Sequence, residues 1–306
     1  MRTTSAAIAL FAGIAAEWAG CAGYEGKSLR ERVFNLIAAD GGVTRREGVP
    51  YGPLPRQKLD IYEPARTPEK AGVALFFYGG GWREGQRATY RFVGAALAAR
   101  GFVTVIADYR LFPEAAFPEF MEDAARAYGW VDDHVARNGK RPIVLIGHSA
   151  GAYMAALLAL DPSYLARFAP CAAAPGGLVG MAGPYSFDPT TWPTTREVFS
   201  RAANDPDKAR PVAFASSTAP PALLLYGLRD DVVGAENRLK LAKALTEQGA
   251  SVQRIDYPGI GHIGLVMAIG RPLRWRAPVL DDIVDFLGSV SARPPKAAPG
   301  QNCRES

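Results

Sequence analysis

Short runs rich in β-branched and aromatic residues alternate with helical patterns along this 306-residue chain, and this alternation is what most constrains the fold. The runs that predict strands lie at residues 58–62, 73–78, 103–107, 143–146, 177–181, 222–226 and 252–257. The patterns that predict helices lie at residues 90–100, 117–137, 150–160, 235–248 and 280–290. Strands that alternate with helices are typical of a mainly parallel sheet with helices on both faces. We therefore predict an α/β fold of that kind.

The composition is that of an ordinary globular protein. Hydrophobic residues make up 48% and charged residues 21%, so the chain can bury a large core without metal or disulfide staples. Lys and Arg exceed Asp and Glu by only 35 to 30, and no basic run is interleaved with aromatic residues. The three cysteines and three histidines show no metal-ligand spacing. We expect neither a nucleic-acid partner nor a bound metal.

The N-terminal residues have the features of an export signal. Arg2 precedes an apolar stretch at residues 6–16, which is too short to span a bilayer as a helix but suits the core of a signal peptide. Small residues before Cys21 resemble a bacterial lipoprotein cleavage site, at which Cys21 would carry a lipid that tethers the domain to a membrane. We expect an exported, periplasmic or membrane-anchored protein. The alternatives are an ordinary secretory peptide and an N-terminal segment of a cytoplasmic protein.

The chain divides into four parts on this interpretation. The predicted order is a signal peptide or lipoprotein signal at 1–21, a polar lead-in at 22–47, the α/β domain at 48–290 and a tail at 291–306. The tail holds three prolines and no apolar periodicity, so we expect it to be disordered.

The strongest local signal is the sequence Gly-His-Ser-Ala-Gly at residues 147–151. The predicted strand at 143–146 precedes it and a helical pattern follows it, which is the setting in which a G-x-S-x-G motif exposes a reactive serine. The turn brings chain segments together where a side chain would clash, so it needs its glycines, and it holds the serine in a strained conformation. The pattern predicts Ser149 as a nucleophile.

A run of three glycines and Trp82 follows the predicted strand at 73–78. Acyl transfer needs preplaced donors for a negative oxygen, and glycines let backbone N–H groups approach it. A phosphate-binding loop is excluded because the Lys-Ser/Thr of a P-loop and the G-x-G-x-x-G spacing are both missing here. Residues 78–82 resemble the HGGG-type oxyanion motif of esterases and lipases, with Tyr78 in place of His, which changes the polar contact that orders the loop. The resemblance implies N–H donors from Gly80, Gly81 and Ala150.

The predicted base is His262. It follows a predicted strand and a loop at 258–261, which puts it at the edge of the sheet where ligands bind in such folds. We expect His148, within the serine turn, to point away from the serine oxygen. His134 lies in a charged helical segment, where we expect it to be exposed.

The carboxylate partner of the base should come between the serine and the histidine in chain order. Asp230 and Asp231 both follow the predicted strand at 222–226. Successive side chains point in different directions, so only one of the two can hold the imidazole. The pattern Gly-x-x-Asp-x-x-Val of the esterases and lipases that this sequence resembles fits Gly227, Asp230 and Val233. We predict Asp230, with Asp231 as the alternative.

The resemblance covers residues 51–287. Its further marks are the segments 55–62, 108–111 and 117–118, and Trp130. Together they resemble the carboxylesterase and hormone-sensitive-lipase-like group of α/β-hydrolases, closest to its feruloyl-esterase-like, kynurenine-formamidase-like and isoprenylcysteine-methylesterase-like members. The resemblance implies an α/β-hydrolase fold, serine ester hydrolysis and no cofactor.

Substrate specificity in such folds is expected from the segment at residues 185–219, which is rich in aromatic residues. We predict substrate contacts from Trp82 and Tyr185, with plain core packing as the alternative for each. The predicted function is hydrolysis of small carboxylic esters through Ser149, His262 and Asp230. The alternatives are an arylformamidase or other amidase with the same residues, and a non-catalytic surface binding protein. Neither the natural substrate nor the oligomeric state follows from the sequence.

Overall fold

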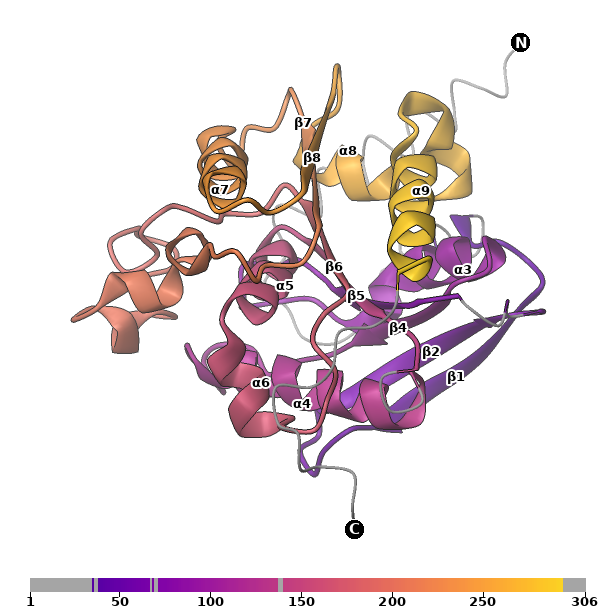
Figure 1. The fold of residues 1–306 in the computed structure, drawn as a ribbon, viewed down its shortest axis with the longest axis horizontal. Coiled ribbons are helices and arrows are strands. Elements are labelled where there is room, and N and C mark those ends of the chain that lie inside the picture. The colour runs from indigo at the N-terminus through magenta and orange to yellow at the C-terminus, as the bar shows by residue number, and fades with distance from the viewer. Residues whose placement is uncertain (1–34, 36–37, 67, 69–70, 137–139, 294–306) are drawn as a thin grey trace.

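The computed structural model describes residues 35, 38–66, 68, 71–136 and 140–293 (Figure 1). The predicted signal at 1–21, Cys21 and the tail beyond residue 293 lie outside the described residues. Export, lipidation and tail disorder therefore stay predictions.

An eight-stranded sheet forms the centre of the molecule, in the order β1-β2-β4-β3-β5-β6-β7-β8. The strands are β1 (Val43–Pro50), β2 (Lys58–Pro64), β3 (Val73–Phe77), β4 (Val103–Ala107), β5 (Ile143–His148), β6 (Gly177–Met181), β7 (Ala222–Gly227) and β8 (Val252–Tyr257). β2 pairs antiparallel with both of its neighbours, β1 and β4, and the strands from β4 to β8 pair parallel. Strands β3 to β7 are buried along their whole length, as expected of a parallel sheet covered on both faces. The predicted mainly parallel sheet is confirmed.

β1 is a strand that the sequence pattern did not predict. Its sequence, VTRREGVP, is mostly exposed at the edge of the sheet, so it lacks the apolar run that marks a buried strand. Arg45 pairs with Glu47 and Arg46 with Glu63, and charged side chains are typical of a protected sheet edge. The sheet therefore begins at Val43, ahead of the predicted domain start at residue 48.

Helices cover both faces of the sheet (Figure 1). On one face lie α3 (Arg91–Ala99) and α9 (Val279–Ser291), which contact each other, and on the other lie α4 (Glu119–His134), α5 (Ala150–Leu160) and α7 (Glu236–Glu247). The short helices α6 (Pro162–Phe168) and α8 (His262–Met267) were not predicted. The single-turn helices are η1 (Arg87–Tyr90), η2 (Ser200–Ala202), η3 (Pro206–Ala209), η4 (Pro211–Phe214) and η5 (Arg271–Arg276).

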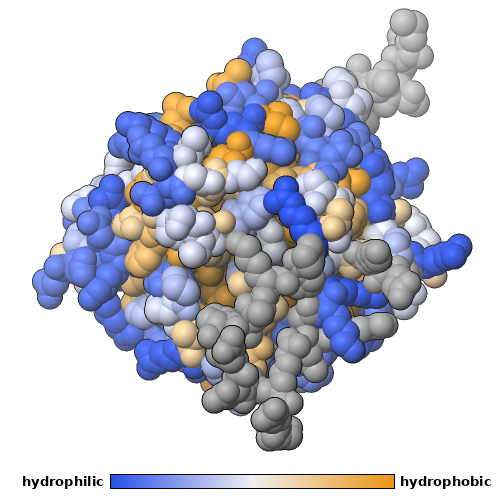
Figure 2. Space-filling view, in the orientation of Figure 1, coloured by the Kyte–Doolittle hydropathy of each residue, from blue (hydrophilic) through white to orange (hydrophobic). Residues whose placement is uncertain are grey.

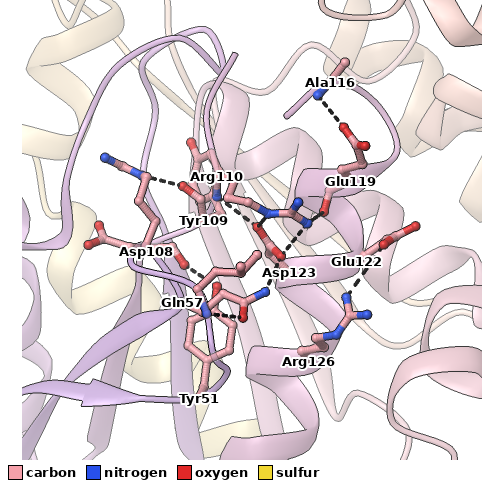
Figure 3. Close-up of polar contacts among 12 residues, drawn as sticks. Tyr51, Gln57, Asp108, Tyr109, Arg110, Ala116, Glu119, Glu122, Asp123 and Arg126 are labelled. Carbon is pink, nitrogen blue, oxygen red and sulfur yellow. Dashed lines mark hydrogen bonds and ion pairs between the residues drawn. The ribbon is translucent and has the colours of Figure 1, made fainter. Parts of the chain in front are cut away.

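A buried ion pair fastens α4 to the loop that follows β4 (Figure 3). The carboxylate of Asp123 is fully buried and accepts hydrogen bonds from the Arg110 guanidinium at 2.8 and 2.9 Å and from the Arg110 backbone N–H at 2.9 Å. Gln57 donates a further bond to it at 2.8 Å. A buried charge needs this many partners to offset its desolvation. The contacts give Arg110, which lies in the segment 108–111 of the resemblance, a structural role.

The face of the molecule in Figure 2 is largely polar. Figure 2 shows hydrophilic side chains over most of one face, with apolar residues scattered between them. None of the helices in the described part of the chain combines the length and apolar character that a membrane crossing requires.

Candidate active site

Ser149 lies in the sharp turn between β5 and α5, with φ 55° and ψ −122°. Its backbone N–H donates to the carbonyl oxygen of Met181 at 2.9 Å. A Cβ at Gly147 would lie 2.1 Å from the Gly151 carbonyl oxygen, and one at Gly151 would lie 2.0 Å from that of Phe77. Both positions of the turn therefore require glycine. A non-glycine residue at positive φ is strained by roughly 1–3 kcal/mol, which the packing around Ser149 must offset.

The glycine loop after β3 lies directly against this serine. A Cβ at Gly79 would come within 3.0 Å of the Ser149 Cβ. Gly80 and Gly81 have φ of 128° and 58°, and the carbonyl of Gly80 closes the turn by accepting bonds from Arg83 and Glu84. Within the described residues the N–H groups of Gly80 and Gly81 donate to no acceptor, so they are free to bind a ligand oxygen.

Tyr78, in the place where the HGGG motif has His, orders the loop through its hydroxyl. The side chain is fully buried, and its hydroxyl donates to Asp108 at 2.8 Å and accepts from Arg56 at 2.9 Å. Arg56 also donates to the carbonyl oxygen of Gly85 at 2.8 Å. Burial first, and the Asp108 charge next, raise the pKa of Tyr78 well above its ordinary value, so it remains a donor. The substitution therefore replaces the polar contact instead of removing it.

His262 begins α8 and is paired with Asp230. Its Nδ1 lies 2.8 Å from the Asp230 Oδ2, and both side chains are almost completely buried. Since a carboxylate can only accept, Nδ1–H donates, which leaves Nε2 as the proton acceptor in the neutral imidazole. In serine hydrolases a buried carboxylate fixes the tautomer of the catalytic histidine in the same way.

Asp230 is held for this contact by its own loop. Its Oδ1 accepts the backbone N–H groups of Val232 and Val233, each at 2.9 Å. Burial by itself raises the pKa of the Asp230 carboxyl, but the hydrogen bond and charge of His262 and the two backbone N–H groups together lower it below the ordinary value. Asp231 is exposed, so the structure brings Asp230, and not its neighbour, to the histidine.

The two other histidines differ in their surroundings. His134 is exposed, as predicted, and stacks on Trp130 with ring centroids 4.4 Å apart. His148 is buried, and its Nε2 lies 3.0 Å from the backbone oxygen of His262. The contact between residues 148 and 262 is not predictable from the sequence, because only the fold brings these two histidines together.

Both predicted substrate contacts are buried side chains. Trp82 is 2% exposed and packs edge-on against Tyr153 and Phe199. Tyr185 is 1% exposed and covers Gly180 and Gly183. Their positions match the core-packing alternative more closely than an open pocket wall. The part of the chain that the structure describes holds no cluster of His, Cys, Asp or Glu suited to a metal ion.

Known proteins with similar sequences are esterases. The chain is 31% identical over 238 residues to "Esterase LipC" of Mycobacterium tuberculosis, an alignment that covers 71% of this chain and 59% of LipC. It is 26% identical over 265 residues to isoprenylcysteine alpha-carbonyl methylesterase ICME of Arabidopsis thaliana, covering 79% and 62% of the two chains. The chain thus spans about three fifths of the length of these curated relatives.

Solved structures confirm the fold. Esterase B from Lactobacillus rhamnosis, inhibited by a tributyrin phosphonate, superposes with a TM-score of 0.72 at 17% identity, over 93% of this chain and 96% of that one. The BD-FAE family matches residues 59–166, which include the glycine loop and Ser149. The prolyl oligopeptidase family matches residues 118–291, which include Ser149, Asp230 and His262. The chain therefore has the α/β-hydrolase fold and belongs to the prolyl oligopeptidase family.

Proposed function

We propose that this protein is a serine esterase that cleaves small carboxylic esters. The observation that carries the proposal is the 2.8 Å contact between the buried pair His262 and Asp230, in a fold that also sets Ser149 at a strained turn. The esterase names of the curated relatives support the ester class. A binding protein has no need for an oriented imidazole and a strained serine in one fold, which favours the enzyme over the non-catalytic alternative.

In the proposed reaction Ser149 is the nucleophile. Its Oγ transfers a proton to Nε2 of His262 and attacks the ester carbonyl carbon, so that the carbonyl oxygen becomes negative. The N–H groups of Gly80, Gly81 and Ala150 are the proposed donors to this oxygen, and one such donor contributes about 10²–10³-fold to kcat in other hydrolases.

Collapse of this intermediate breaks the bond to the alcohol. His262 returns its proton to the leaving oxygen, the alcohol departs, and an acyl group remains on Ser149. His262 then takes a proton from water, which attacks the acyl carbon. His262 returns this proton to Ser149 Oγ as the bond between Oγ and the acyl carbon breaks, which releases the carboxylic acid and restores the free enzyme. Asp230 holds the imidazole and stabilises its protonated form throughout. No step requires a metal or a cofactor.

A fluorophosphonate probe tests the proposal. The wild-type protein should form one adduct, located on Ser149 by peptide mass spectrometry, and hydrolyse short-chain aryl esters. Ser149→Ala should lose both properties at unchanged thermal stability. A folded wild-type protein without an adduct at Ser149 would overturn the proposal. Faster turnover of N-formylkynurenine than of the aryl esters would replace it by the amidase alternative.

We propose further that the protein is exported and that Cys21 carries a lipid. The support is the apolar stretch at 6–16 and the small residues before Cys21. Mass spectrometry of the mature N-terminus should find a chain that begins at a lipid-modified Cys21. A chain that begins at an unprocessed Met1 would contradict export, and an unmodified mature N-terminus would contradict lipidation alone.

A further inference from the structure

His148 joins the serine turn to the loop of the base. It ends β5 directly before Ser149 and is 1% exposed. Its ring lies against the ring of His262, with centroids 4.8 Å apart and planes at 45°. Its Nε2 lies 3.0 Å from the backbone oxygen of His262. One side chain therefore contacts both the ring and the backbone of the proposed base.

The hydrogen bond fixes the protonation of His148. A carbonyl oxygen only accepts, so Nε2 carries the proton and donates it. Nδ1 is then an acceptor; it is buried, lacks a hydrogen-bond partner in the described structure, and faces Gly79, where a Cβ would lie 3.2 Å from it. Burial first, and the proximity of His262 next, lower the pKa of His148 to about 3. His148 is thus a neutral donor at any pH where His262 serves as a base.

This neutral donor has a specific effect on the base. Asp230 holds the ring of His262 through Nδ1, but no hydrogen bond in the described structure joins Asp230 to the His262 backbone. His262 is also the first residue of α8, a helix of only six residues. The bond from His148 holds that backbone directly to β5, the strand that carries the nucleophile. A positively charged His148 in the same place would repel the imidazolium that forms during acyl transfer, whereas the neutral side chain does not.

We propose that His148 is a positioning residue that couples the serine turn to the base, by donating to the His262 carbonyl and packing against the His262 ring. The proposal rests on the proposed function of Ser149, His262 and Asp230. It concerns the distance and orientation between nucleophile and base, for which a misplacement of about 1 Å can cost on the order of 10²-fold in rate.

Three variants separate this role from simple packing. In His148→Gln the side-chain amide nitrogen takes the place of Nε2 and can still donate. His148→Leu fills the space without a donor, and His148→Asn keeps an amide that is too short to reach the His262 carbonyl. The measurements are kcat and KM for an aryl ester, the second-order rate of fluorophosphonate labelling of Ser149, and thermal stability.

We expect the Leu and Asn variants to lose about 30- to 100-fold in kcat and in labelling rate, with KM within about threefold of wild type. The Gln variant should recover kcat to within about fivefold. The proton on His262 Nδ1 should give a sharp downfield NMR resonance in wild type and in the Gln variant, and a broadened one in the Leu and Asn variants.

Two results would overturn the proposal. One is wild-type labelling and kcat in His148→Asn, which folds with a polar side chain even if His148→Leu does not. The other is a loss in all three variants that follows their thermal stability, with no recovery in the Gln variant. Failure of the wild-type protein itself to react with the probe would overturn the proposed function instead.

Discussion

Asp230 and Asp231 are adjacent in the chain but differ completely in environment. Three donors converge on the carboxylate of Asp230, from His262, Val232 and Val233. The side chain of Asp231 faces solvent. Chain order limits the choice to these two residues, and the spacing from Gly227 to Val233 favours the first. The contact itself depends on the loop after β8, which is distant in sequence.

Asp230→Asn should lower kcat by about 10⁴-fold, because an amide nitrogen facing Nδ1 favours the wrong tautomer of His262. Asp231→Asn is the matched control and should stay within about twofold of wild type, since exposed changes have small effects. Steady-state kinetics on both variants, with thermal unfolding to verify the fold, measure the difference. Equal activity in the two variants would contradict the assignment of Asp230.

At the scale of elements, close packing of helix α5 on strand β3 decides where the serine turn lies. Gly151, the second residue of α5, has the Phe77 carbonyl where its Cβ would be. The predicted strands at 103–107 and 177–181 coincide with β4 and β6, both of which are buried along their whole length. Apolar runs with strong periodicity are thus predictable, whereas β1 and α8 are not: β1 is polar, and α8 is too short for a period to show.

Gly151→Ala should lower the free energy of unfolding by about 1–3 kcal/mol or more, since its Cβ would clash with the Phe77 backbone, which cannot rotate away. Gly288→Ala is the matched helix control: a Cβ there meets nothing within 4 Å, so the variant should gain about 0.5–1 kcal/mol. Urea unfolding of both variants gives the two values. A Gly151→Ala protein as stable as wild type would show that α5 and β3 are not in close contact.

At the scale of the whole molecule, burial of His148 makes stability depend on pH. The unfolded histidine has a pKa of about 6.5, and the folded one a pKa lowered to about 3, chiefly by burial. Between these values the unfolded state binds one proton more than the folded state, so stability falls as the pH is lowered.

Wild type should therefore lose about 1.4 kcal/mol per pH unit more than His148→Gln between about pH 6 and pH 4, and the slopes of the two proteins should match above about pH 7. Urea unfolding across this range measures the slopes. Other titrating groups contribute equally to both proteins and cancel in the difference. Parallel curves would show that His148 is accessible to protons in the folded state.

The sequence alone determined the α/β class, the serine turn with its two required glycines, the glycine loop, and the short list of bases and acids. These features depend on local periodicity and on residues close in the chain, which are visible without a fold. The tertiary structure decided what depends on distant segments. It put Asp230 rather than Asp231 against His262, supplied Asp108 and Arg56 as partners for Tyr78, and buried Trp82 and Tyr185 in the core. It also brought His148 into contact with His262. These residues are more than a hundred positions apart in the chain, but β5 and the loop after β8 meet at the carboxyl edge of the sheet.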